Sequence, residues 1–258
     1  LGVAYVPGPS GTMTAYAGRL WPVNPGRGQF EWGTVSTFYP DGDPETTSVD
    51  GDLQNSNGGP DTTFALLRDR TTSDTSFESD PTARPRVASG GLTNEWNIFS
   101  RAFLLFDTSS LPDTDTIESA TMDIVLTAKT DNFTEAGSMS MVTSSPASNT
   151  AIVLTDYDNF GTTKQATDRT IAGLTADSAT YQSFTLNATG LTNVSKTGIS
   201  KYGIRSTFDN DNTPPTWGGD LFSAITFATA EEILAGDKRP KLVVTHVAAA
   251  SGKFFAVF

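Results

Sequence analysis

One apolar stretch, from Arg101 to Phe106, dominates the pattern of hydrophobic and polar positions along the chain. Successive side chains of a β-strand point to opposite faces. One face of this strand would therefore carry Phe103 and Leu105, and the other Ala102, Leu104 and Phe106. A strand that is apolar on both faces is normally covered on both. The pattern thus predicts a central strand whose two faces are buried.

A turn signal ends this strand. Asp107 stands where the apolar pattern stops, and its carboxylate can accept hydrogen bonds from the amides that follow. Leu111 and Pro112 then anchor and stiffen the exit from the turn. Nothing in the stretch indicates catalysis, so we interpret it as core strand and tight turn.

Shorter alternating segments predict the other strands. They are separated by clusters of Gly, Pro, Asp, Asn and Ser, with no long amphipathic helices between them. This spacing is typical of an antiparallel sandwich or jelly roll rather than a βαβ fold. The segments cover residues 34–39, 45–49, 64–68, 97–106, 119–128, 138–143, 150–154, 181–186, 202–208, 223–228 and 241–247, and residues 71–95 are expected to form a long surface loop.

Two short helical segments interrupt this pattern. Asn187 is a good N-cap for a helix over residues 188–196, which Gly198 would end. A second helical turn is expected between Ala228 and Leu234. The predicted fold is therefore all-β, an antiparallel jelly-roll-like β-sandwich over residues 34–246.

The two terminal segments differ from this domain. Residues 1–33 are rich in Gly and Pro but carry large apolar side chains, which predicts an extended docking arm rather than a flexible linker; a disordered terminus is the alternative. Residues 247–258 form a linker and an apolar tail strand that would pair with a sheet edge if left free. The residues expected to dock are Trp21, Trp32, Phe254, Phe255 and Phe258.

Composition narrows the function classes. The 258-residue chain carries a formal net charge of −12, which disfavours binding to nucleic acid. It has no Cys, so disulfides, thiolate metal sites and a cysteine nucleophile are excluded. No run of 18 apolar residues occurs, and no membrane span is therefore expected.

The central strand and the segment after it resemble a known family. Arg101 to Pro112 followed by Ile117-Glu118-Ser119-Ala120-Thr121, with Arg239-Pro240-Lys241-Leu242-Val243-Val244 as a closing strand, resembles the signature of DNRLRE-type β-sandwich modules. These are carbohydrate-binding-like jelly rolls of bacterial and archaeal surface proteins.

A narrower resemblance is to versions of these modules in phage virion and metagenomic structural proteins. It is carried by short segments at residues 39–51, 145–150, 156–161, 195–203 and 212–217. The resemblance covers about residues 36–246, leaves both terminal segments outside, and implies no shared catalytic residues.

Candidate chemistry is limited by the single histidine. Any Ser-His-Asp arrangement must use His246, whose place at the end of an alternating strand favours a structural role. Zinc is disfavoured because one His and no Cys leave only carboxylates. No metal is required, and calcium is the better candidate because it prefers closely spaced carboxylates and carbonyls, although Asp and Asn are also ordinary turn residues. The candidate calcium ligands are Asp156, Asp158, Asp209 and Asp211, and acids also flank turns at Asp41, Asp43, Asp50 and Asp52.

Sugar binding is a further candidate activity. Trp96, Tyr157 and Trp217 lie in or near expected loops, where aromatic faces could stack on sugar rings; the alternative is that each packs against its own sheet. The acidic residues show no signature of a glycoside hydrolase.

These observations together predict a non-enzymatic structural protein of an extracellular assembly. The first hypothesis is a virion surface protein, such as a capsid decoration, fibre or tail protein, attached through its terminal segments to copies of itself or to other proteins of the assembly. The alternative is a secreted carbohydrate-binding module that mediates adhesion to polysaccharide.

Overall fold

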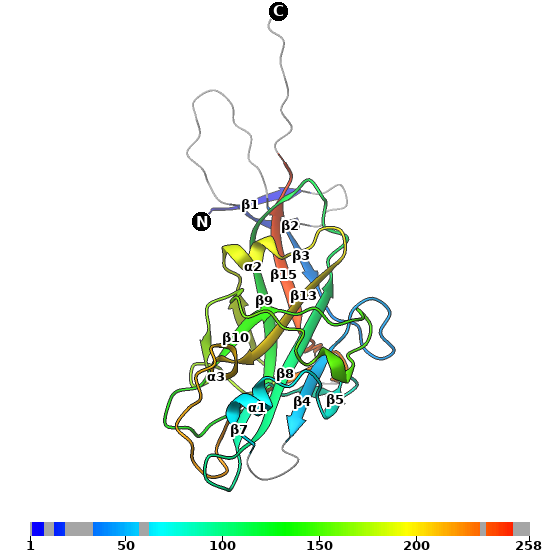
Figure 1. The fold of residues 1–258 in the computed structure, drawn as a ribbon. Coiled ribbons are helices and arrows are strands. Elements are labelled where there is room, and N and C mark those ends of the chain that lie inside the picture. Colours follow the sequence, from blue (N-terminus) through cyan, green and yellow to red (C-terminus); the bar gives the residue numbers. More distant parts are fainter. Residues whose placement is uncertain (1, 8–12, 19–32, 57–61, 233–235, 250–258) are drawn as a thin grey trace, which may run out of the picture.

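The computed structural model describes residues 2–7, 13–18, 33–56, 62–232 and 236–249. Within these residues the chain is an antiparallel β-sandwich, which confirms the predicted all-β class (Figure 1). None of the described helices is long and apolar enough to cross a membrane.

One layer of the sandwich has four strands in the order β12, β9, β15 and β3. Their bounds are β12 (Tyr181–Thr185), β9 (Thr116–Asp131), β15 (Lys241–Val247) and β3 (Thr34–Phe38). In the described part of the chain β3 pairs only with β15, so it is an edge strand.

The other layer is built around β8 (Trp96–Asp107). On one side β8 pairs with β13 (Ile199–Ser206), which leads on to β10 (Ser138–Thr143) and β11 (Arg169–Thr170). It also pairs with β4 (Asp50–Ser56), which carries β5 (Thr75–Phe77), and with β7 (Arg86–Ser89).

Strand β9 belongs to both layers. Its first part pairs with β12 and β15, and its last part, from Leu126 to Asp131, pairs with β14 (Phe222–Ala228). β14 pairs in turn with β7 and with β6 (Thr82–Ala83). One continuous strand therefore joins the two sheets.

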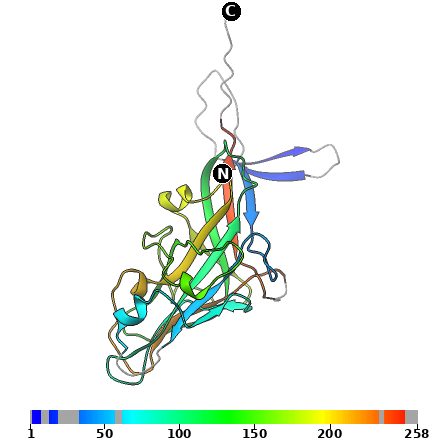
Figure 2. The ribbon, with the colours of Figure 1, turned by 45° about the vertical axis from the view of Figure 1, so that its right-hand side comes forward.

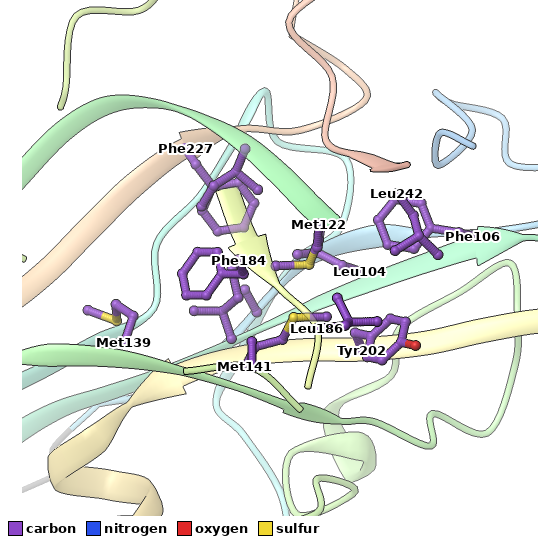
Figure 3. Packing of buried hydrophobic residues seen from close by; sticks show 14 of the residues in the cluster. Leu104, Phe106, Met122, Met139, Met141, Phe184, Leu186, Tyr202, Phe227 and Leu242 are labelled. Carbon is purple, nitrogen blue, oxygen red and sulfur yellow. The ribbon is translucent and has the colours of Figure 1, made fainter. Parts of the chain in front are cut away.

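The main core lies between the layers (Figure 3). Leu104 and Phe106 of β8 face Met122 of β9 and Leu242 of β15, and all four side chains are fully buried. Alternation along each strand brings these apolar side chains to the same side, as the sequence pattern predicts.

A second apolar cluster covers the outer face of β8. Phe103 and Leu105 pack there beneath α1 (Phe64–Arg68), the segment around η1 (Leu154–Asp156), and α3 (Thr207–Asn210). Phe103, Leu104, Leu105 and Phe106 are all 0% exposed. The prediction that both faces of this strand are buried is confirmed.

The turn after β8 also forms as predicted, because Ser109 N donates to Asp107 Oδ1 at 3.0 Å. Helix α2 (Ala188–Thr192) is capped by Asn187, whose Oδ1 accepts from Gly190 N at 2.9 Å, but it ends four residues earlier than expected.

The prediction of a strand over residues 64–68 is wrong. Thr63 caps the first turn of α1 by accepting from Leu66 N, and the buried Phe64 and Leu67 are three residues apart, which is helical spacing. The pattern is too short for alternation and helical periodicity to be told apart.

Other boundaries also differ from the predictions. The expected surface loop at 71–95 contains β5, β6 and β7, whereas residues 45–49 and 150–154 are not strands. Near Ala228–Leu234 the described residues form a strand end and a turn, not a helix.

Part of the expected extended arm is a hairpin, in which β1 (Gly2–Pro7) pairs with β2 (Met13–Gly18). Figure 2 shows it beside the end of the sandwich at which β15 finishes. The docking residues Trp21, Trp32, Phe254, Phe255 and Phe258, and the expected tail strand, lie outside the described residues.

Candidate functional site

A trio of charged side chains lies in the interior beside β8, joined by several hydrogen bonds. Asp209 Oδ2 accepts from Arg101 Nε and from Arg205 Nε, each at 2.8 Å, and Oδ1 accepts from the Nη2 atoms of both residues. Arg101 also donates to the carbonyl oxygens of Tyr157 and Arg68, and its guanidinium lies 4.2 Å from the centre of the Tyr157 ring. Every member is almost fully buried.

The electrostatics of this trio favour the charged forms. Burial alone would raise the pKa of Asp209, but the attraction of Arg101 and Arg205 and their hydrogen bonds hold that pKa well below its usual range. Burial likewise opposes the charge of Arg101, and Asp209 nevertheless raises its pKa. The trio is a satisfied structural network, and no oxygen of Asp209 is left for a metal ion.

The other predicted calcium ligands, Asp156 and Asp158 at one turn and Asp211 at another, also lie beside protein donors. Asp156 is buried and accepts from Ala147 N, Val153 N and Asn159 Nδ2, which organises its own turn. Asp211 pairs with Lys164 at 2.8 Å. Asp158 is largely exposed, 3.8 Å from Arg101 Nη1. Because most of their oxygens already accept hydrogen bonds from protein donors, the geometry does not favour calcium at these four residues, and calcium there stays a prediction.

The aromatic residues predicted to bind sugar are mostly inside the protein. Tyr157 is 0% and Trp96 5% exposed, and both belong to the outer cluster on β8. Trp217 is half-buried, and its Nε1 donates to Glu95 O at 3.0 Å. The expectation that these rings form a sugar-stacking surface is corrected for Trp96 and Tyr157, since a buried ring offers no face to a ligand.

The single histidine does meet a serine and an aspartate. His246 Nδ1 lies 2.7 Å from Asp115 Oδ2, and its Nε2 lies 3.0 Å from Ser36 Oγ. Asp115 can thus fix the tautomer in which Nε2 accepts the serine proton. His246 is 4% exposed and lies on the inner face of β15 with Leu242 and Val244. The hydrogen bonds among Ser36, His246 and Asp115 therefore connect β3, β15 and the loop before β9.

An acidic cluster joins Asp43, one of the acids at the turns of residues 41–52, to an acid of a distant loop. Oxygens of Asp43, Glu45 and Glu231 all lie within 4.8 Å of one another. Burial, together with Asp43 and Glu231, raises the pKa of Glu45 to about 7. Burial and Glu231 raise the pKa of the neighbouring, fully buried Asp50 well above its usual range. The closely spaced carboxylates of residues 41–52 are visible in the sequence, but Glu231 is far from them along the chain, so the sequence could not show that it lies beside them.

The chain enters and leaves the sandwich at one place. Thr34, the first residue of β3, lies opposite His246 near the end of β15. On the outer face of β3, Val35 is 57% exposed. The chain therefore enters β3 and leaves β15 at the same end of this strand pair, and β3 is an edge strand among the described residues (Figure 2).

Comparison with known proteins identifies no family. No family model and no curated protein matches the chain. Among solved structures, the crystal structure of the infectious bursal disease virus VP2 subviral particle aligns with 98% of this chain and 69% of that one, at 10% sequence identity and a TM-score of 0.18. A similarity of this size carries no argument about function.

Proposed function

We propose that this chain is a structural protein of an extracellular assembly, such as a virion surface protein, that attaches through its terminal segments. The sandwich provides a stable body, and residues 1–33 and 247–258 provide the contacts with copies of the chain or with other proteins of the assembly. The resemblance to sandwich modules of phage virion proteins supports the same role.

The common exit of the two terminal segments carries the proposal. Both segments hold large apolar side chains, and both adjoin one end of the β3–β15 pair, in which β3 is the edge strand of the described sheet. An edge strand presents unpaired backbone groups with which an incoming strand can pair. Apolar area buried there contributes about 25 cal/mol per Å². The edge and the segments thus form one attachment surface.

Truncation tests this proposal. We expect the full chain to form oligomers, or to join its assembly, and a chain without residues 1–32 and 250–258 to be monomeric by light scattering. Because the described sandwich is left intact, its melting temperature should change by less than about 3 °C. Val35→Lys in the full chain should weaken association by placing a charge at the edge.

A control with the exposed Leu92→Lys, away from that edge, should associate like the unchanged chain. Association that survives removal of both terminal segments would contradict the proposal.

One observation favours a second candidate function, hydrolysis by an activated serine. Ser36, His246 and Asp115 have the hydrogen-bond distances of a nucleophile, a base and its orienting carboxylate. A fluorophosphonate probe would then label Ser36, and Ser36→Ala or His246→Gln would abolish labelling. A folded wild-type chain that no probe labels would remove this candidate.

A further inference from the structure

The apolar core does not reach along the whole inner face of β8. Ala102, Leu104 and Phe106 belong to the core between the two layers. Ile98 and Ser100 lie on the same face of the strand, because side chains two residues apart share a face, but neither belongs to that core, and Ile98 is half-buried. The inner face therefore changes character towards the start of β8.

Polar and small side chains occupy this part of the inner face. The strand register places Ser100 of β8 between Gln54 of β4 and Arg86 of β7, and Arg86 lies opposite Ala224 of β14. Residues directly opposite each other in a sheet share a face. Phe222, two residues before Ala224, lies on this face as well. Gln54, Arg86 and Phe222 are half-buried, so solvent reaches this row in part.

Two arginine side chains share the ring of Phe222. The guanidinium carbon of Arg86 lies 4.7 Å from the centre of that ring, and the guanidinium carbon of Arg84 lies 5.5 Å from it. The Nε atoms of both arginines are buried and have no hydrogen-bond partner. Burial, followed by the charge of Arg84, lowers the pKa of Arg86 to about 10, which is the direction expected of two like charges held together.

No carboxylate of the described residues pairs with these two guanidinium groups. Neither Arg84 nor Arg86 forms an ion pair within the part of the chain that the structure describes. Asp52 lies close to Arg84, but its carboxylate oxygens accept from Arg84 N and Ser100 Oγ instead. The two charges are thus left without a counter-charge of their own.

Two other arginines lie over aromatic rings in the described ranges, and each also binds a carboxylate. Arg101 lies over Tyr157 and pairs with Asp209 at 2.8 Å. Arg239, over another ring, pairs with Asp237 at 2.8 Å. The arginine pair over the β14 ring has the ring contact without the carboxylate. Since buried charges are normally paired, an anion from outside the chain would complete this arrangement.

We propose that Arg84 and Arg86 bind a divalent oxyanion, a sulfate or phosphate group, beside Phe222 on the inner face of the β8 layer. Two adjacent guanidinium groups carry two positive charges, which a dianion neutralises, and their forked N–H donors match its oxygens. Gln54, in the same row, offers a further amide donor.

The site lies away from the proposed attachment surface. Figure 1 shows β4 and β7 at the opposite end of the sandwich from the end at which β15 finishes. Anion binding therefore does not rest on the proposed function, and it would remain possible in a chain that is attached through its terminal segments.

Calorimetric titration of the full chain with sodium sulfate and with sodium phosphate, at an ionic strength held constant with NaCl, tests the proposal. We expect one site per chain that takes both anions. Arg86→Gln should weaken binding by about tenfold or more, and Arg84→Gln/Arg86→Gln should abolish it. Arg239→Gln is the matched control, because Arg239 also lies over a ring but has its own carboxylate, and it should bind both anions like the wild type.

The same titration with dextran sulfate distinguishes the two sources of the group. Tighter binding of the polymer that is lost in the double variant would indicate an esterified ligand, and equal affinity per sulfate group would indicate the free ion. The double variant removes two charges that repel each other, so it is expected to fold, and circular dichroism verifies this. No heat of binding by the wild type with any of the three probes at millimolar concentration would overturn the proposal, as would equal binding by the folded double variant.

Discussion

Asp209 accepts hydrogen bonds from two guanidinium groups that are themselves buried, so its charge is neutralised inside the protein. Removing one member of such a group leaves an uncompensated charge in the interior, which costs far more than losing a surface ion pair. The neighbouring Asp211 pairs with Lys164 at the surface and offers a direct comparison.

We expect Asp209→Asn to lower the free energy of unfolding by about 3–5 kcal/mol, because Arg101 and Arg205 would lose their shared counter-charge. Asp211→Asn, two residues away, should cost no more than about 1 kcal/mol. Urea unfolding of both variants measures the difference, and equal small losses would show that the trio does not stabilise the fold.

A second buried acid makes stability depend on pH. Burial raises the pKa of Asp52 to about 6, although hydrogen bonds from Ser100 and Arg84 oppose the shift. The folded state thus binds this proton more tightly than the unfolded chain, whose pKa is about 4. The free energy of unfolding should therefore fall by about 3 kcal/mol between pH 4 and pH 6 on account of this group, and level off above.

Asp52→Asn should remove that share of the pH dependence, and unfolding measured from pH 4 to pH 8 would reveal it. The exposed Glu118→Gln should leave the slope as it is. An unchanged slope in Asp52→Asn would mean that Asp52 is ionised throughout.

Residue type alone could not assign these roles. Asp209 lies in an Asp-Asn-Asp-Asn run that is typical of a cation-binding loop, but its partner Arg101 is 108 residues away in the sequence. Asp115 and Ser36 likewise reach His246 only because β3, β15 and the loop before β9 are adjacent. Spacing along the chain carries no information about such contacts.

At the scale of single elements, β8 shows what a hydrophobic pattern can predict. Because both faces of β8 are apolar, each must pack against another part of the protein. The opposite sheet packs on one face, and α1, α3 and the η1 segment pack on the other. Strands β10 and β15 have the predicted bounds because their alternation is regular. Strands β5 to β7 were missed because they have only two to four residues each and lie among turn residues, too few positions for an alternating pattern to show.

We expect Leu104→Ala and Leu105→Ala each to lower the free energy of unfolding by about 2–5 kcal/mol, since the two side chains are fully buried in different clusters. Leu66→Ala on α1, where the side chain is 62% exposed, should cost less than about 1 kcal/mol. Denaturant unfolding compares the three, and a small loss at Leu105 alone would mean that the outer cover is loosely packed.

At the scale of the whole molecule, the net charge opposes the attachment proposed above. Each chain carries a formal charge of −12, so copies repel at long range, whereas the proposed contacts of the apolar terminal segments would attract at short range. Salt shortens the reach of the repulsion to about 10 Å at 0.1 M. Self-association should therefore strengthen at least severalfold between about 10 mM and 200 mM NaCl, as sedimentation velocity would measure; weaker association at higher salt would instead indicate attraction between charges.

The adjacency of Thr34 and His246 has a mechanical consequence. A force that pulls the two terminal segments away from each other acts first on the last residue pair between β3 and β15. The hydrogen bonds between these two strands would then break one after another. A load that draws both segments in the same direction is shared by β3 and β15 and acts along β9, which shears many bonds at once. The sandwich would therefore resist a higher force when both terminal segments are pulled in the same direction than when they are pulled in opposite directions.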